Sequence, residues 1–360
     1  MKYWNKTLAD MQEYIYGEQP GGTAGFVKLN TNENPFPPSK DVIEAIKKHA
    51  DDRLRLYPDA KSDALRKIFA EENGLSTDNV FVGNGSDEIF TLIFRGFIEK
   101  DGVAAFPYPS YSLYYTLAQG NGIAHKKVQL EDDFSYNMDK FLNQNFALVI
   151  ISNPNNPTGT YCPADEIARF CEAFEGLLVV DEAYIDFYGG SSIELVNKFD
   201  NIIITRSMSK SYSLAGLRVG LAAANKDIIS GLMKIKDSYN VDTLSQAGAV
   251  AALLDKKTFN SNITYNMRNN KDYLEERLAA MDFTIVPSRA NFLFVKHSDI
   301  SAEEIYLKLK EKKILVRHLK GERQSDYVRI SVGSMGEIKS LCKELESICN
   351  VSHEAGTPDS

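Results

Sequence analysis

Residues 177–184 read Leu-Leu-Val-Val-Asp-Glu-Ala-Tyr, a run of four apolar residues that ends at once in two carboxylates. An apolar run of this length is typical of a strand that is buried on both faces of a sheet. Similar runs recur at 80–82, 103–106, 148–151 and 202–205, and amphipathic stretches such as 88–98 and 165–174 separate them. This alternation predicts right-handed βαβ units and a mostly parallel sheet flanked by helices.

The second part of the chain has a different order of elements. A long helical pattern over 227–254 is followed by predicted strands at 284–287, 291–295 and 328–332 and predicted helices at 262–281, 302–312 and 335–348. This pattern indicates a smaller α+β domain. We therefore expect an N-terminal arm (1–28), a large α/β domain (29–255), a small C-terminal domain (256–350) and a flexible tail (351–360).

Composition excludes several classes of protein. The 360 residues are 43% hydrophobic and 25% charged, which are globular values. The formal net charge of −8 argues against a broad basic face for nucleic acid. The four cysteines form no CxxC pair, so neither a disulfide scaffold nor a zinc ribbon is expected. The first eleven residues lack the apolar core of a secretion signal, and no apolar run approaches the ~18 residues of a membrane span. We expect a cytoplasmic protein.

Polar residues follow five of the predicted strands, at the point where each strand ends. Ligands of open parallel sheets bind at the carboxyl ends of the strands, so these segments should meet at one edge. One such segment is ordinary, whereas five together predict a binding site. The segments are Gly83–Glu88, Pro107–Tyr111, Ser152–Gly159, Asp181–Tyr184 and Arg206–Lys210.

Each candidate residue also has a purely structural explanation. The segment 83–86 is either a turn with an N-cap or an anion site at a helix N-terminus. Asp181 is either a helix cap or a partly buried carboxylate that fixes a cationic ring nitrogen. Lys210 is either a solvated loop lysine or a buried amine that forms a Schiff base. Arg218 stands among small and apolar residues, so its charge needs a partner, and a phosphate would serve.

Other chemistries lack the residues that they need. The histidines form no HExxH or paired-ligand spacing, which argues against a zinc hydrolase, and we expect no metal site. The segment 333–336, Gly-Ser-Met-Gly, is one residue short of a GxSxG nucleophile elbow. Tyr111 and Tyr184 are either core aromatics or groups that cover and hydrogen-bond a flat ring.

The motifs resemble those of fold-type I pyridoxal-phosphate aminotransferases. The segments 207–210 and 216–220 resemble that family's cofactor-lysine segment, and 153–159 and 181–184 look like its ring-binding motifs. Narrower features are similar to the histidinol-phosphate aminotransferase branch, namely Leu29–Pro35, Leu56–Asp59, Gly83–Glu88 and Val328–Gly333. The segment 13–17 departs from the branch's usual Tyr-x-Pro-Gly, which leaves Tyr14 and Tyr16 as alternatives for a substrate-facing residue.

This resemblance implies a mixed seven-stranded sheet in the large domain and pyridoxal 5′-phosphate as the cofactor. It implies that Lys210 forms the covalent link to the cofactor and moves the proton, and that Asp181 keeps the pyridine nitrogen protonated. Tyr184 and Asn156 would hydrogen-bond the ring hydroxyl, and Tyr111 would stack on the ring. The phosphate would be held by Gly85, Ser86 and Asp87 through their backbone amides, by Ser207, Ser209 and Arg218, and by Tyr57 from the second subunit of a homodimer.

The substrates implied by the resemblance share an amine and a negative charge. Glutamate ends in a carboxylate and histidinol phosphate in a phosphate, and a planar guanidinium binds either group through two hydrogen bonds. Arg329 is the first candidate for this role because a strand interior is poorly solvated. Arg317 is the second candidate, and Tyr14 and Asn32 complete the predicted substrate contacts.

We therefore predict transamination between L-histidinol phosphate and 2-oxoglutarate, which yields imidazole acetol phosphate and L-glutamate in histidine biosynthesis. Alternatives on the same scaffold are an aminotransferase for aromatic amino acids and a decarboxylase of the threonine-phosphate type. A non-catalytic binding protein would not need both Lys210 and Asp181. Expected partners are the amino donor, the oxo-acid acceptor and a second copy of the chain, with no nucleic acid and no membrane.

Overall fold

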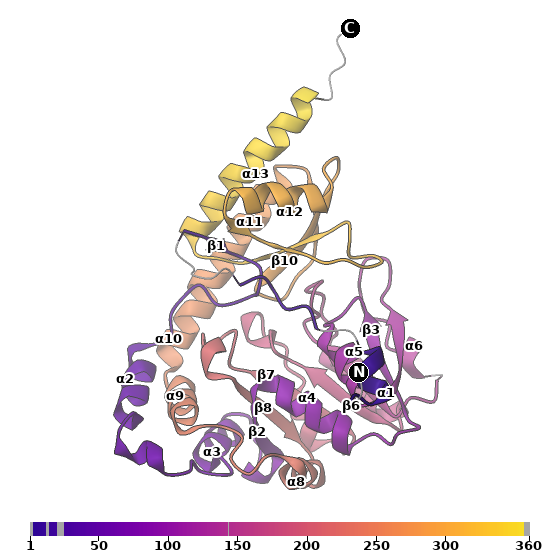
Figure 1. Ribbon diagram of the computed structural model, residues 1–360, viewed down its shortest axis with the longest axis vertical. Coiled ribbons are helices and arrows are strands. Elements are labelled where there is room, and N and C mark those ends of the chain that lie inside the picture. Colours follow the sequence, from indigo (N-terminus) through magenta and orange to yellow (C-terminus); the bar gives the residue numbers. More distant parts are fainter. Residues whose placement is uncertain (1–2, 12–13, 20–24, 143, 356–360) are drawn as a thin grey trace.

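A mixed seven-stranded sheet forms the centre of the larger domain (Figure 1). The computed structural model describes residues 3–11, 14–19, 25–142 and 144–355. Four strand pairs of the sheet are parallel, and β8 runs antiparallel to both of its neighbours. In sheet order the strands are β2 (Val80–Asn84), β8 (Val219–Ala224), β7 (Ile202–Ser207), β6 (Leu177–Asp181), β5 (Leu148–Ser152), β3 (Val103–Tyr108) and β4 (Ala124–Gln129). The predicted fold class is confirmed.

Successive residues of the central strands enter cores on opposite faces of the sheet, because strand side chains alternate. On β6, Leu178 and Val180 belong to one core and Val179 to the other. The Val179 side is covered by α4 (Gly85–Gly96), α5 (Leu113–Gly120) and α8 (Lys226–Ile235). The opposite side is covered by α2 (Lys40–His49), α3 (Asp63–Glu72), α6 (Asp139–Leu142), α7 (Ala164–Ala173) and α9 (Thr243–Leu254). Asp181 therefore projects toward α4 and α5.

The continuous helix that the sequence pattern predicts over 227–254 is wrong. The chain leaves the helical conformation at Lys236, and Asp242 begins α9 by accepting a hydrogen bond from the backbone N–H of Ser245. The intervening residues 237–240 read Asp-Ser-Tyr-Asn, which are mostly turn formers. The sequence on both sides of this loop has helical apolar periodicity, so the pattern by itself indicates one continuous helix.

The smaller domain has a core of its own around a four-stranded antiparallel sheet. In sheet order its strands are β12 (Arg317–His318), β13 (Val328–Ser331), β10 (Phe292–His297) and β9 (Phe283–Val286). Its helices are α10 (Lys256–Asn260), which continues through helical residues 261–267 into α11 (Arg268–Ala279), then α12 (Ala302–Glu311) and α13 (Met335–Ala355). Helix α13 extends away from the rest of the molecule at its C-terminal end (Figure 1). It ends at residue 355, so the first half of the predicted tail is helical, and residues 356–360 lie outside the described ranges.

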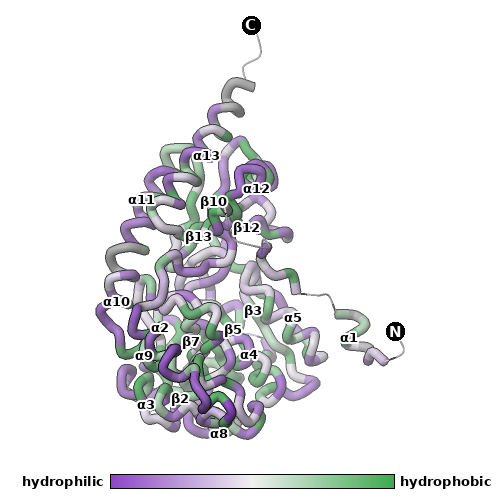
Figure 2. The backbone as a smooth tube through the Cα atoms, turned by 60° about the vertical axis from the view of Figure 1, so that its left-hand side comes forward, coloured by the Kyte–Doolittle hydropathy of each residue, from purple (hydrophilic) through white to green (hydrophobic). Residues whose placement is uncertain are grey.

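The N-terminal segment contacts both domains. Helix α1 (Lys6–Asp10) lies at the outer side of α5 (Figure 2), and the side chain of Asn5 caps its first turn. Farther along, β1 (Val27–Lys28) pairs in parallel with β11 (Ile314–Leu315) of the small domain. Across the described ranges, no helix is both long enough and apolar enough to span a membrane.

Two leucines of α12 test how much the packing of the small domain contributes to stability. Leu309 is fully buried in the small-domain core, whereas Leu307, two residues earlier, is 50% exposed. Leu309→Ala leaves a cavity and should lower the free energy of unfolding by about 2–5 kcal/mol. Leu307→Ala should change it by about 0.5 kcal/mol or less. Equal effects of the two substitutions in urea unfolding would contradict the described orientation of α12.

Candidate active site

The site begins with a row of polar side chains across the end of the large sheet. Ser152, Asp181 and Thr205 are register partners on β5, β6 and β7. All three are buried, and alternation places them on the face covered by α4 and α5. The carboxyl ends of these three parallel strands therefore meet there, as expected for an open sheet of this kind.

Asp181 is held by uncharged hydrogen-bond donors. The Tyr114 hydroxyl donates to Oδ2 at 2.6 Å, while the backbone N–H of Ala183 and the Thr205 hydroxyl donate to Oδ1 at 3.2 and 3.3 Å. Burial raises the pKa of Asp181 to about 6, and these three hydrogen bonds oppose that rise. No ion pair to Asp181 occurs among the residues that the structure describes. The carboxylate thus lacks a cation and would fit a protonated ring nitrogen.

Tyr114 is a further candidate site residue, and the sequence pattern does not reveal it. It lies in the first turn of α5, and its side chain is fully buried. Nothing in the linear spacing connects residue 114 with residue 181. Only the register of β6 and the packing of α5 bring the two together, although the neighbouring Tyr111 had been identified as a candidate.

Lys210 follows β7, and its amine lies in the same region. Its Nζ donates to the backbone oxygen of Thr31 at 2.9 Å and lies 6.0 Å from the centre of the Tyr184 ring. Burial lowers the pKa of Lys210 to about 8, and the positive charges of Arg329 and Arg218 act in the same direction. An amine with this pKa is a far better nucleophile near neutral pH than an ordinary lysine.

Residues 29–34 cross the site between the two domains. The Asn30 oxygen accepts from Arg329 at 2.7 Å, and the Thr31 oxygen accepts from Lys210. Asn32, at φ +56°, donates from Nδ2 to the Tyr184 hydroxyl at 3.1 Å. Asn32 thus reaches the predicted site, whereas Asn30 and Thr31 contribute backbone oxygens that no side-chain pattern could have identified.

A cluster of polar and charged groups lies at the start of α4. Arg218 Nη1 donates to the Ser209 hydroxyl and Nη2 to Asp87 Oδ2, both at 3.2 Å, and the Ser209 N–H donates to the Ser207 hydroxyl. Gly85 has φ +73°, and a Cβ at this position would lie 2.6 Å from Arg218 Nη2. First-turn N–H groups, including that of Ser86, have no acceptor within a helix, so they and Arg218 suit a phosphate.

Arg218 itself differs from expectation in its surroundings. The sequence suggested a charge enclosed by small and apolar residues, yet the guanidinium is about half exposed, at 45%. The residue adopts φ +51°, at the start of β8. This conformation directs the side chain back toward α4, where Asp87 is its partner.

Two arginines lie opposite each other on the small domain. Arg317 and Arg329 are register partners on β12 and β13. Arg329 is buried, donates from Nη1 to Asn156 Oδ1 at 2.6 Å, and leaves Nε without a partner. Burial lowers the pKa of Arg329 to about 10, with a further contribution from the charge of Arg317. Neither has a carboxylate partner in the described part of the chain, so the pair favours an anion.

The aromatic candidates separate into two groups. Tyr14 lies edge-on to Tyr111, with ring centres 6.4 Å apart, whereas Tyr16 is 68% exposed. Arg317 donates to the backbone oxygens of Ile15 and Tyr16 at 2.9 and 3.1 Å, which holds this segment at the site. Of the two tyrosines left open by the sequence, Tyr14 is therefore the one that faces the other candidates.

Tyr57 does not join this cluster within the chain. It is 80% exposed, and its ring stacks on Tyr239 at a centroid distance of 4.3 Å. Leu54 and Leu56 beside it are also exposed. The location of Tyr57 gives no support for a contact with a cofactor in its own subunit.

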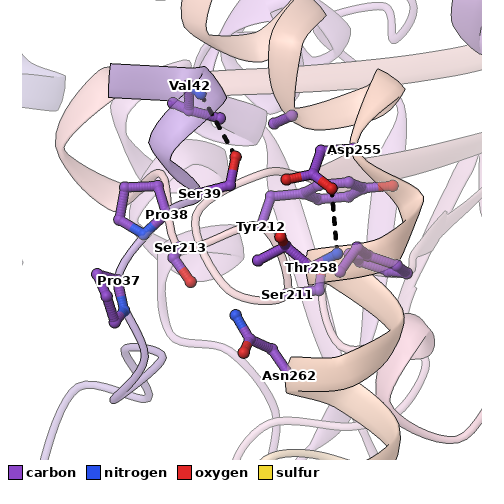
Figure 3. Close-up of a pocket in the computed structure, with 12 residues that line it drawn as sticks. Pro37, Pro38, Ser39, Val42, Ser211, Tyr212, Ser213, Asp255, Thr258 and Asn262 are labelled. Carbon is purple, nitrogen blue, oxygen red and sulfur yellow. Dashed lines mark hydrogen bonds between the residues drawn. The ribbon is translucent and has the colours of Figure 1, made fainter. Parts of the chain in front are cut away.

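A small cleft lies beside the loop that carries Lys210. Figure 3 shows it between Pro37, Pro38 and Ser39 on one side and Asp255, Thr258 and Asn262 on the other, with Ser211–Ser213 forming its wall. Its volume is about 20 Å³, which is room for roughly one water molecule. This cleft is too small for a substrate, so the cluster around Lys210 is the better candidate. Among the described residues, no group of three or more His, Cys, Asp or Glu side chains could hold a metal.

Lys210 should titrate far below an ordinary lysine. Because its pKa is lowered to about 8, the amine is mostly protonated below pH 8 and mostly neutral above it. Labelling of cofactor-free protein with acetic anhydride, followed by mass spectrometry of the Lys210 peptide, should show an inflection near that pH. Arg329→Gln removes a nearby positive charge and should move the inflection upward, while Arg169→Gln on the exposed face of α7 should not. An inflection near 10.5 in the unaltered chain would contradict the described burial.

Comparison with known proteins agrees with the family that the motifs suggested. The family model described as aminotransferase class I and II matches residues 24–345. A histidinol-phosphate aminotransferase of Clostridium botulinum is 40% identical over 97% of this chain and 99% of its own length. Histidinol-phosphate aminotransferase 1 of Oceanobacillus iheyensis is 41% identical over 96% of this chain and 98% of its own.

A solved structure extends this likeness to the fold. Histidinol-phosphate aminotransferase from Sinorhizobium meliloti, in complex with pyridoxal-5′-phosphate, has a TM-score of 0.85 and 26% identity, with 90% of this chain and 91% of that chain covered. The family that the sequence motifs predicted is thereby confirmed. This chain belongs to the class I and II aminotransferase family.

Proposed function

We propose that this chain is a pyridoxal-phosphate-dependent transaminase that exchanges an amino group between L-histidinol phosphate and 2-oxoglutarate, as in histidine biosynthesis. The observation that carries the choice of substrate is the facing pair Arg317 and Arg329, which has no carboxylate partner among the described residues. Both proposed substrates bring a negative group to such a pair. The name shared by relatives at about 40% identity supports the same substrate.

The residues fit the cofactor at each of its polar positions. When bound, the cofactor supplies an aldehyde that reacts with amines and a ring that accepts an electron pair. Asp181 would face the ring nitrogen, because it is a buried carboxylate with no ion-pair partner in the described ranges of the chain. Ser207, Ser209, Arg218 and the first turn of α4 (Gly85, Ser86 and Asp87) would hold the phosphate.

The remaining residues would orient the substrate and move its proton. Lys210, whose pKa is about 8, is the base that would take a proton from the substrate carbon and return it. Tyr184 and Asn156 would hydrogen-bond the ring hydroxyl, and Tyr111 would cover the ring face. Tyr14, through its contact with Tyr111, would close the substrate side.

Several transaminases and a decarboxylase share this scaffold, so the substrate is tested directly. Measurement of kcat/KM for histidinol phosphate beside phenylalanine and tyrosine, with 2-oxoglutarate as acceptor, should favour histidinol phosphate. Release of CO2 from a phospho-amino acid without any oxo-acid acceptor would instead identify the decarboxylase. Lys210→Ala should abolish the cofactor link that borohydride reduces, and a surviving link would move that role to another lysine.

Arg329 should contribute to the binding of both substrates. Arg329→Ala removes a buried guanidinium, so KM for glutamate and for histidinol phosphate should rise together by about tenfold or more. Arg317→Ala should act in the same direction, whereas Arg169→Ala, on the exposed face of α7, should leave both values unchanged. Unchanged KM values in Arg329→Ala would remove this residue from the site.

A homodimer would complete the site. Tyr57 is exposed together with Leu54, Leu56 and Tyr239, and such an apolar surface suits a second copy of the chain. In that dimer, Tyr57 would reach the cofactor phosphate of the other subunit. One core lies within residues 42–253 and another is built mostly of residues after 255, with Leu29, Tyr184 and Phe187 added, which supports the proposed division into a large and a small domain. A biosynthetic role suits the proposed cytoplasmic location.

Mixed dimers test whether the site is shared. Each site would take Lys210 from one subunit and Tyr57 from the other. Lys210→Ala and Tyr57→Phe therefore each remove one of the two contributions to a site. A heterodimer of the two variants contains one site with both residues intact. Random exchange makes about half of the dimers heterodimers, so mixing equal amounts of the two variants should restore cofactor retention and activity to about a quarter of the unaltered level. An active monomer in analytical ultracentrifugation, or the absence of any restoration, would contradict the shared site.

A further inference from the structure

The phenol of Tyr114 makes the shortest hydrogen bond to the carboxylate at the centre of the site. Its hydroxyl lies 2.6 Å from Asp181 Oδ2, whereas the two donors to Oδ1 lie at 3.2 and 3.3 Å. Short hydrogen bonds from a hydroxyl to a carboxylate are about twice as strong as those between neutral groups. Tyr114 is therefore the principal donor to Asp181.

Aromatic neighbours fix the phenol in this position. The Tyr114 ring contacts Phe90 of α4 at 5.2 Å, Phe106 of β3 at 5.9 Å and Tyr111 at 5.4 Å between ring centres. The side chain is fully buried, so it has no room for another rotamer. One residue thus touches both Asp181 and Tyr111, two groups proposed to meet the cofactor ring on different sides.

The Tyr114 hydroxyl stays protonated, and so remains a hydrogen-bond donor, throughout the neutral pH range. Burial and the neighbouring charge of Asp181 raise the pKa of Tyr114 well above its ordinary value, so the hydroxyl keeps its proton. The other titratable groups around Asp181 are Asp87, Tyr184 and Tyr136. Asp87 is an anion that disfavours charge on Asp181, and the two tyrosines remain neutral hydroxyls because burial raises their pKa values.

We infer that Tyr114 is a positioning residue that sets the proton affinity of Asp181 and thereby keeps the shared proton on the cofactor ring nitrogen. This inference rests on the proposed function. A carboxylate and a pyridine nitrogen compete for one proton, and the better-solvated carboxylate gives it up more readily. Without the phenol, Asp181 would bind the proton more tightly, the ring nitrogen would lose its charge, and the ring would accept electrons less well.

The adjacent residue provides a matched control. Tyr115 lies on the same helix and donates to the backbone oxygen of Pro107 at 2.7 Å. Tyr115→Phe therefore removes one phenolic hydrogen bond of α5 without touching Asp181. Thr205→Val removes a weaker, 3.3 Å donor to Asp181 and supplies a graded comparison.

The first measurement is the pH dependence of binding to cofactor-free protein. The probe is 4′-deoxypyridoxine 5′-phosphate, which has the ring nitrogen and phosphate but no aldehyde, so that Lys210 cannot react. Affinity should fall on the acid side as Asp181 becomes protonated. In Tyr114→Phe this fall should begin at higher pH, with about tenfold weaker binding at pH 6 than in Tyr115→Phe. Thr205→Val should shift the curve in the same direction by less.

The second measurement separates chemistry from binding. At saturating pyridoxal phosphate, Tyr114→Phe should lower kcat by about tenfold while KM for both substrates stays within twofold, because Tyr114 touches neither substrate. Superimposable pH profiles and equal kcat values for Tyr114→Phe and Tyr115→Phe, with matching melting temperatures, would overturn the inference. Failure of the unaltered chain to bind pyridoxal phosphate at all would instead overturn the proposed function.

Discussion

The site depends on a buried carboxylate that forms no ion pair with any residue that the structure describes. Asp181 ends a strand that is enclosed on both faces, and burial raises its pKa to about 6. A carboxyl group whose pKa is higher in the folded than in the unfolded chain contributes stability below pH 4 that is lost as pH rises through 6. At neutral pH the fold therefore bears an electrostatic cost, and a bound cationic nitrogen would offset it.

Among the described residues, the small domain has an excess of positive charge at the site, whereas the large domain has an unpaired negative charge there. Arg317 and Arg329 face each other across two strands, and Arg329 is buried with one nitrogen unpartnered. The positive charge of Arg329 also helps to lower the pKa of Lys210. A bound anion would relieve the repulsion between the arginines and would raise the proton affinity of the lysine. Substrate binding and the protonation of the amine are in this way linked through charge.

Much of the large sheet, including where its strands end, can be predicted from the local sequence. Runs such as 148–151 and 202–205 are apolar because both faces of those strands are covered, and the polar residues after them mark the ends of the strands. Two strands of the seven-stranded sheet are not predicted by such runs, for physical reasons. β4 is an edge strand with Val128 as its one buried residue, and β8 is built largely of glycine and alanine, so neither shows a strong apolar run.

The sequence predicts most directly those site residues whose side chains stand at the end of their own strand. Asp181, Ser207 and Lys210 are of this kind, and the structure brings them to one edge of the sheet. Tyr114 reaches Asp181 from a helix more than sixty residues earlier in the chain, through packing that no spacing records. The role of the Thr31 backbone oxygen cannot be predicted from the sequence either, because every residue has the same backbone carbonyl group.

The segment that contains Thr31 has a mechanical consequence. Leu29 pairs with Leu315 and Ser331 through its backbone, and the Ser331 hydroxyl accepts the N–H of Asn32, so this stretch is fastened to the small domain. Lys210, from the large domain, is tied to the same stretch through the Thr31 oxygen. When the Lys210 amine reacts, its hydrogen bond to the Thr31 oxygen is lost. The large and small domains then lose one of the contacts that hold them at their present separation.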